Sequence, residues 1–174
     1  MSAESITAVC ATVIAVLSLM ISLQESHAVR QHNRQSIRPA LQLSHIRRRG
    51  GITGIGLTNC GIGPAVITQT ILKLDGVLLG AWDESTVNTF RERLRPVPGA
   101  RTFLPGHTLA VGYNELLLYL NEFDVEQHMD FWNLIRHQLE LEIHYESLYG
   151  GENFVAFLPK GPGRELSTEA LGPR

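Results

Sequence analysis

An unbroken run of twenty uncharged residues between Glu4 and Glu25 constrains this chain more than any other feature. Its core, residues 6–23 (ITAVCATVIAVLSLMISL), is apolar apart from two threonines and two serines. As an α-helix this core spans roughly 27 Å, close to the hydrocarbon thickness of a bilayer. Small hydroxyl groups are tolerated there because they bond to the helix's own backbone. The run therefore predicts one transmembrane helix, with residues 1–24 as the anchor.

A cleaved signal peptide is the competing interpretation, because Ser26, His27 and Ala28 form an acceptable cleavage site of the small-x-small type. Signal peptides begin with a positively charged segment, whereas residues 1–5 contain no Lys or Arg. The apolar run is also longer than the usual hydrophobic region of about 7–15 residues. We therefore expect the segment to stay uncleaved.

Basic residues flank only the C-terminal side of the predicted span. They are Arg30, Arg34, Arg38, Arg47, Arg48 and Arg49, and no acidic residue lies between Val29 and Gly51. Because positive flanks stay on the cytoplasmic side, this asymmetry predicts that the body of the protein is cytoplasmic. The six arginines are also predicted to contact the membrane surface, where each basic residue gains about 1 kcal/mol from anionic lipid. Residues 25–39 form the predicted basic juxtamembrane stalk.

Nucleic acid is excluded as the predicted partner. The chain has 15 Lys and Arg against 17 Asp and Glu, a formal charge of -2, so it is not a polycation. No aromatic residue lies between Leu23 and Trp82 to stack on bases near the arginines. The lipid bilayer is therefore the predicted partner of the basic segment.

One face of the predicted span collects small residues. Ala11, Ala15, Ser18 and Ser22 follow one another at steps of four, three and four, which places them on one side of a helix. Small side chains let two membrane helices approach closely, so this face predicts helix pairing and self-association. The alternative, that Ala and Ser are simply common in such helices, remains equally open.

Beyond Pro39 the pattern changes to short β-strands separated by turns. The predicted strands are residues 40–46, 52–59, 65–74, 77–79, 108–111, 139–145 and 153–158. Residues 139–145 alternate apolar and polar side chains at every position, which is typical of a half-buried strand. Residues 115–120 fit either a helix or a buried strand.

Two short helices are predicted among these strands, residues 83–94 with Asp83 as N-cap and residues 124–135. Strands outnumber helices and do not alternate with them, which favours an antiparallel β-sandwich over a parallel sheet. The predicted fold is therefore mainly β, with the sandwich in residues 40–160 and a disordered tail in residues 161–174.

Three stretches carry a family resemblance. They are QHNRQSIRP (residues 31–39), LTNCGIGPAVI (57–67), with its NxGxGPA loop, and IHYESLYG (143–150), with its YxSxYG strand. In this order behind an apolar span they resemble uncharacterised bacterial membrane proteins with a single N-terminal anchor and an immunoglobulin-like β-sandwich. The resemblance implies a bacterial inner-membrane location and this architecture. It implies no activity and no catalytic residue.

The loop from Asn59 to Ala65 is the most distinctive local motif. The Asn59 side chain can bond the backbone two residues further on, Gly61 and Gly63 can take positive φ, and Pro64 fixes the start of the next strand. A structural turn is therefore predicted. The alternative is a ligand loop in which the backbone amides hold an anion, although the Lys-Ser/Thr end of a nucleotide-binding loop is absent.

Glu140, Glu142 and His144 share the polar face of one strand, and carboxylates beside a histidine suggest a metal site or an acid–base pair. Alternate strand positions are about 6.6–7 Å apart, so a metal would need ligands from a neighbouring strand. A solvated strand face is therefore the favoured interpretation, and an enzyme that uses these three residues is the alternative. The two cysteines, Cys10 and Cys60, exclude a disulfide framework. We expect no metal and no cofactor.

Residues 115–152 hold nine acidic residues and one basic residue, Arg136. A protein partner is one interpretation of this acidic half, and a solvated surface is the other. The sequence therefore predicts a membrane-anchored interaction or accessory module without catalysis of its own. The alternative is a ligand- or anion-sensing domain that signals through pairing of the membrane helix.

Overall fold

The computed structural model describes residues 11–26, 37–48 and 51–160 of the chain. Contacts divide the chain into two compact units, Met1–Arg38 and Pro39–Arg174. The predicted tail, residues 161–174, and most of the predicted stalk lie outside the described residues. The boundaries predicted for the anchor, stalk and tail therefore stay predictions.

In the first unit, residues 11–26 form an α-helix whose side chains are all exposed. Within the described part of the chain, no helix is both long enough and apolar enough to cross a membrane. The predicted span begins at residue 6, and residues 1–10 lie outside the described part.

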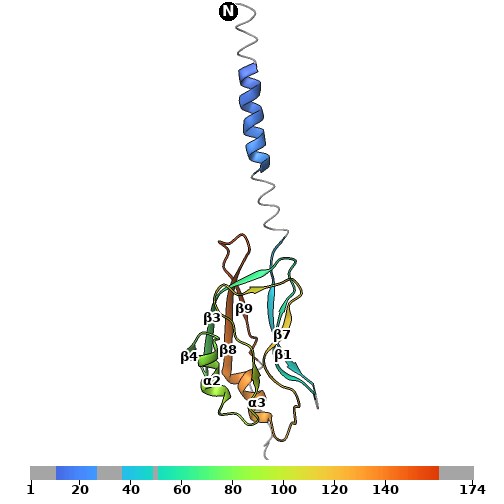
Figure 1. The fold of residues 1–174 in the computed structure, drawn as a ribbon, viewed down its shortest axis with the longest axis vertical. Coiled ribbons are helices and arrows are strands. Elements are labelled where there is room, and N and C mark those ends of the chain that lie inside the picture. The colour runs from blue at the N-terminus through green and yellow to red at the C-terminus, as the bar shows by residue number, and fades with distance from the viewer. Residues whose placement is uncertain (1–10, 27–36, 49–50, 161–174) are drawn as a thin grey trace, which may run out of the picture. The chain divides into compact units, whose positions relative to one another are not determined.

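The second unit is built mainly from antiparallel strands (Figure 1). Its elements are β1 (Leu41–Arg47), β2 (Thr53–Asn59), β3 (Ala65–Leu74), β4 (Val77–Gly80), α2 (Glu84–Arg91), β5 (Gly99–Ala100), β6 (Thr108–Leu109), β7 (Asn114–Leu120), α3 (Met129–Asn133), the π-helical segment η1 (Leu134–Gln138), β8 (Leu139–Ser147) and β9 (Phe154–Phe157). One sheet has the order β1-β2-β7-β5. The other has the order β4-β3-β8-β9, with β6 also paired to β3. The prediction of a mainly β fold with short helices is confirmed at this level.

A single cluster of buried side chains draws on both sheets. In β8 the exposure alternates at every residue, so that Leu141 and Ile143 enter the core while Glu142 and His144 face away. This is the period-two pattern expected from the sequence. Trp82, in the link between β4 and α2, is fully buried. Its backbone N–H donates to Thr70 Oγ1 at 2.8 Å and its ring N–H to the Arg101 carbonyl at 2.7 Å.

Two turn signals have the expected geometry. Asp75 and Gly76, which join β3 to β4, have φ angles of 51° and 79°, as a two-residue hairpin turn of type I′ requires. Asp83 caps α2 through a bond of 2.8 Å from the Thr86 backbone N–H to its carboxylate. This bond lowers the pKa of Asp83. The stretch 115–120, open between two interpretations, lies in strand β7.

The predicted helix over residues 124–135 is wrong in extent. Asp124 accepts hydrogen bonds from the backbone N–H groups of Glu126 and Gln127, but these bonds close a local turn. The α-helix α3 begins only at Met129, and after five residues it widens into η1. Phe131, Trp132 and Ile135 enter the core from these two segments. The capping pattern was therefore satisfied by a turn that does not continue into a helix.

Candidate functional site

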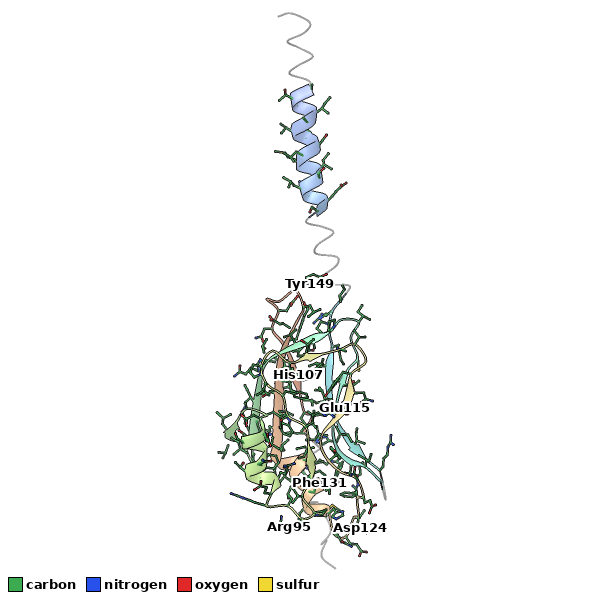
Figure 2. All side chains as sticks on the ribbon, viewed as in Figure 1. Arg95, His107, Glu115, Asp124, Phe131 and Tyr149 are labelled. Atoms are coloured by element: carbon green, nitrogen blue, oxygen red, sulfur yellow. The ribbon has the colours of Figure 1, made fainter. Side chains whose placement is uncertain are left out.

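The strand register gathers several loops at the end of the domain where the chain enters it. Ala65, the first residue of β3, pairs with Ser147, the last residue of β8, and also with Leu109 of β6. At the same end, β1 starts opposite the last residue of β2. We call this the loop end: it comprises residues 39–40, 60–64, 110–113 and 148–153. Figure 2 labels Tyr149 at this end, and Arg95 and Asp124 at the opposite one.

Asn59 is the centre of the loop end, and its side chain is 1% exposed. Its amide nitrogen donates to the carbonyls of Gly63 at 2.9 Å and Ala110 at 3.1 Å, with a longer contact of 3.4 Å to Leu109. Its amide oxygen accepts from the backbone N–H of Ala40 at 3.2 Å and of Gly61 at 3.1 Å. One side chain therefore joins the start of β1 to two loops.

Both the nitrogen and the oxygen of the Asn59 amide therefore make hydrogen bonds within the protein. The bond to Gly61 is the two-residue turn that the sequence indicated. Cys60 is exposed, and its backbone N–H donates to the Ala40 carbonyl at 2.8 Å. Gly63 is buried, and Pro64 directly precedes β3. The expected positive φ at Gly61 and Gly63 is wrong, since neither is among the glycines with that conformation. This geometry is that of a structural turn, while the ligand-loop alternative stays a prediction.

The structure divides the predicted basic cluster. Arg30, Arg34 and Arg49 lie outside the described residues, and Arg38 directly precedes Pro39. Arg47 is the last residue of β1, which at about 3.3 Å per residue ends roughly 20 Å from its start. Arg47 and Arg48 therefore lie away from the loop end. Their predicted contact with the membrane is untested.

Arg47 instead packs against aromatic rings. Its guanidinium carbon lies 4.9 Å from the centroid of the Trp132 ring and 5.4 Å from that of Phe123. The guanidinium of Arg136 lies 5.5 Å from the same Trp132 centroid. Such cation–π contacts hold both arginines beside one indole ring.

A pocket of about 460 Å³ opens beside these groups. We call it the basic pocket, and it is lined by His45, Arg47, Trp132, Arg136, Pro159 and Lys160. His45 Nε2 donates to the Ile135 carbonyl at 2.8 Å, across 90 positions of sequence. Burial lowers the pKa of His45, and nearby Arg136 and His137 lower it further, while the bond to Ile135 raises it. Sequence reasoning missed this pocket because no local pattern links residues so far apart.

The polar face of β8 is occupied by ion pairs. Glu142 lies 3.3 Å from Lys73 and 3.7 Å from His144, and Glu140 lies 2.7 Å from Lys160. The hydrogen bond from Lys160 lowers the pKa of Glu140. Across residues 11–26, 37–48 and 51–160 no three His, Cys, Asp or Glu side chains gather in a way that suits a metal ion.

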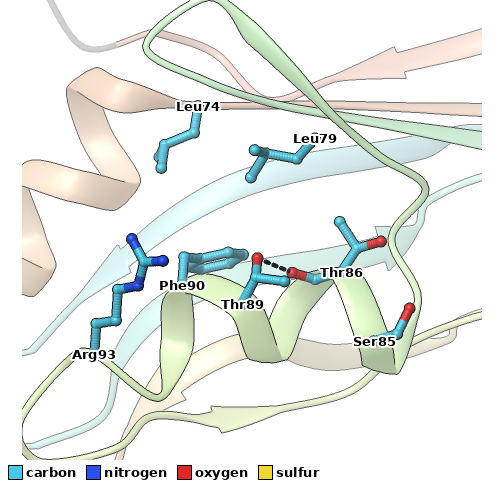
Figure 3. Close-up of a pocket in the computed structure, with 7 residues that line it drawn as sticks. All are labelled: Leu74, Leu79, Ser85, Thr86, Thr89, Phe90 and Arg93. Atoms are coloured by element: carbon cyan, nitrogen blue, oxygen red, sulfur yellow. Dashed lines mark hydrogen bonds between the residues drawn. The ribbon is translucent and has the colours of Figure 1, made fainter.

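A second pocket, of about 430 Å³, lies between α2 and the β3–β4 hairpin (Figure 3). Its lining consists of Leu74, Leu79, Ser85, Thr86, Thr89, Phe90 and Arg93. The Thr89 hydroxyl donates to the Thr86 carbonyl at 2.6 Å, so this group is already bonded within the helix. The pocket combines aliphatic walls with one basic side chain and holds no acid–base pair among the residues that line it.

The small residues Ala11, Ala15, Ser18 and Ser22 all lie exposed on the helix of the first unit. Ser18 Oγ donates to the Ile14 carbonyl at 2.8 Å, the backbone bond that makes a serine compatible with an apolar helix. Helix pairing through this face stays a prediction.

No family model matches this chain, and no curated protein matches it. The resemblance to single-span bacterial proteins therefore stays a prediction.

Replacing Asn59 with Ala tests the role of the loop-end centre. The substitution leaves the buried carbonyl of Gly63, and the partly buried backbone groups of Ala40, Gly61 and Ala110, without their partner, and we expect a loss of about 2 kcal/mol in the free energy of unfolding. Denaturant unfolding of the detergent-solubilised chain, followed by tryptophan fluorescence, measures this loss. The control is Cys60→Ala, at the exposed neighbouring residue, which we expect to change stability little. Equal stability of the two variants would contradict the assigned role.

Proposed function

We propose that this chain is a single-pass protein of the bacterial inner membrane. In this proposal the N-terminal helix is an uncleaved anchor, and the cytoplasmic domain is an interaction or accessory module without catalysis of its own. The observation that carries the proposal is the exposure of large apolar side chains over most of the circumference of the helix over residues 11–26, with no charged residue from 11 to 24.

The exposed large apolar side chains of this helix cover every side except the face of small residues that holds Ala11, Ala15, Ser18 and Ser22. They are Val13, Ile14, Val16, Leu17, Leu19, Met20, Ile21 and Leu23. An amphipathic helix would place such residues on one stripe, cover that stripe against a core and carry charged residues opposite, whereas this helix is broadly apolar and has no charged face, so it needs an apolar surrounding. A bilayer supplies that surrounding, and the apolar sequence extends back to Ile6.

An immunoglobulin-like topology is the proposed form of the domain. In immunoglobulin domains one sheet has the order A-B-E-D, and the other contains C, F and G, with C′ added next to C in variable domains. Lettering β1, β2, β3, β4, β5, β7, β8 and β9 in chain order as A, B, C, C′, D, E, F and G reproduces both orders. This agreement supports the resemblance that the sequence motifs indicated.

The proposed partner-binding role draws on the charged residues far from the loop end. Glu122, Asp124 and Glu126 are exposed in the segment that leads into α3, and Asp130 is exposed in the first turn of α3. Such a dense acidic segment favours a partner with a basic surface, since complementary charge speeds association.

Alkaline carbonate extraction of bacterial membranes tests the anchor. We expect the wild-type chain to stay in the membrane pellet. A variant carrying both Val16→Arg and Leu19→Arg should be released, because each arginine near the centre of a membrane helix costs about 2.5–3.5 kcal/mol. The matched control carries Val77→Arg and Leu78→Arg, at exposed apolar residues of β4, and should stay in the pellet. Release of the wild-type chain would contradict the anchor.

A second function, anion sensing coupled to helix pairing, is favoured by the basic pocket. Two guanidinium groups, held on Trp132 beside Lys160, suit a small oxyanion such as phosphate or a carboxylate. Bound there, the anion would shield the positive charges of Arg47 and Arg136 from each other.

Titration of the detergent-solubilised chain with inorganic phosphate tests the sensing function. Since Trp132 lines the pocket, we expect a saturable change in tryptophan fluorescence, and a loss of at least about tenfold in affinity on Arg136→Gln, because a charge-assisted hydrogen bond contributes about 1.5–3 kcal/mol. The control, Arg95→Gln, should bind as the wild type does. A response that does not saturate, or that survives Arg136→Gln, would exclude this site.

A further inference from the structure

We propose that the loop end of the domain docks directly onto the lipid bilayer, with Ile62, Val111, Leu148 and Tyr149 as the groups that enter the interface. This inference rests on the proposed membrane anchor and goes beyond it, because an anchored domain need not touch the lipid. It assigns the membrane contact to apolar loop residues, in addition to the arginines that precede Pro39 in the sequence prediction, and removes Arg47 and Arg48 from that contact because they lie away from the loop end.

The four side chains come from three separate loops, and all are well exposed. Ile62 is 68% exposed in the loop between β2 and β3. Val111 lies between β6 and β7, and Leu148 and Tyr149 follow β8. An exposed isoleucine, valine or leucine on its own needs no explanation, but several apolar loop tips gathered at one end mark an interaction surface.

Charge is almost absent from these tips. Residues 60–64, 110–113 and 148–151 contain no Asp, Glu, Lys or Arg. The nearest carboxylates are bonded within their own loop. Glu152 accepts from the Ser147 hydroxyl at 2.9 Å, and Glu146 accepts from the Gly151 backbone N–H at 2.9 Å. An uncharged surface loses little hydration energy when it enters the interface.

The chain itself brings lipid to this end rather than to another. The domain begins at Pro39, and Ala40 is fixed to the loop end by its bonds with Asn59 and Cys60. Only residues 24–38 separate Pro39 from the apolar run. A tether this short holds the loop end at high effective concentration near the surface in which the helix is anchored. A bilayer is therefore the occupant that the connectivity favours.

The side chains at the loop tips, and the hydrogen bonds that hold their loops in place, suit a contact with the membrane interface. Aliphatic tips gain by leaving water, and a tyrosine places its ring in the apolar layer while its hydroxyl stays wet. The loops that carry Ile62 and Val111 are held in fixed positions by the Asn59 amide. Because these loops are already ordered, docking costs little conformational entropy. The exposed acidic residues that precede α3, and the basic pocket, would then face away from the lipid.

Fluorescence quenching by lipid tests the docking on the full chain. The background carries Cys10→Ser and Cys60→Ser, and a single cysteine labelled with an environment-sensitive fluorophore replaces either Ile62 or Val77. Ile62 is 68% exposed and Val77 is 65% exposed. Val77 is the first residue of β4 and follows the end of β3 that is farthest from the loop end. The labelled chains are reconstituted into vesicles of phosphatidylcholine and phosphatidylglycerol that contain a spin label high on the acyl chain. A third variant adds Leu148→Asp to the Ile62 probe.

Interfacial segments lie about 5–10 Å inside the boundary between headgroups and acyl chains, within reach of such a quencher. We expect the probe at Ile62 to shift its emission to the blue and to lose more than half of its fluorescence, and the probe at Val77 to change little. Leu148→Asp should reduce the quenching at Ile62. A chain retained in the membrane with equal quenching at both positions would overturn the docking alone. A chain that carbonate extracts from these vesicles would overturn the anchor, and the docking with it.

Discussion

One buried side chain, the amide of Asn59, connects the segments on which the organisation of the domain depends. It donates to carbonyls in two loops and accepts from the backbone N–H groups of Ala40 and Gly61. The Asn59 amide thereby fixes the start of β1 to the β2–β3 loop and to the β6–β7 loop. Because a buried amide without these partners would be costly, the arrangement holds as a unit. The point at which the chain enters the domain and the apolar loop tips consequently belong to one rigid end.

The sequence predicted those parts of the fold that depend on local chemistry. The alternation in β8, the turn at Asp75 and Gly76 and the cap at Asp83 each depend on neighbouring residues, and each occurs where expected. The helix over 124–135 was wrong in extent, since Asp124 closes a turn as readily as it caps a helix. The basic pocket was beyond prediction, because it depends on contacts between His45 and a segment some 90 positions away. Likewise, Arg47 is the last residue of β1 and therefore lies away from the loop end, where the chain enters the domain. The spacing of the arginines along the sequence does not reveal this separation.

The two ends of the domain differ in charge and in exposed apolar side chains, and the proposed function rests on this difference. The loop end is apolar at its tips and nearly free of charge, whereas the acidic residues that lead into α3 and the arginines on Trp132 lie elsewhere. An anchored domain with these properties has one end suited to lipid and another suited to a charged partner or a small anion. Ion pairs between Lys73 and Glu142, and between Lys160 and Glu140, cover the polar strand face that resembled a metal site in sequence.

Membrane orientation is the central claim of this account, because the placement of the domain and its choice of partners both follow from it. The most direct measurement uses two C-terminal fusions of the full chain in a bacterial host, one to a fluorescent protein that matures only in the cytoplasm and one to a phosphatase that is active only after export. The account predicts a fluorescent first strain and an inactive phosphatase in the second, since the arginines follow the span on its C-terminal side. A dark first strain and an active phosphatase would contradict it and would place the domain outside the inner membrane.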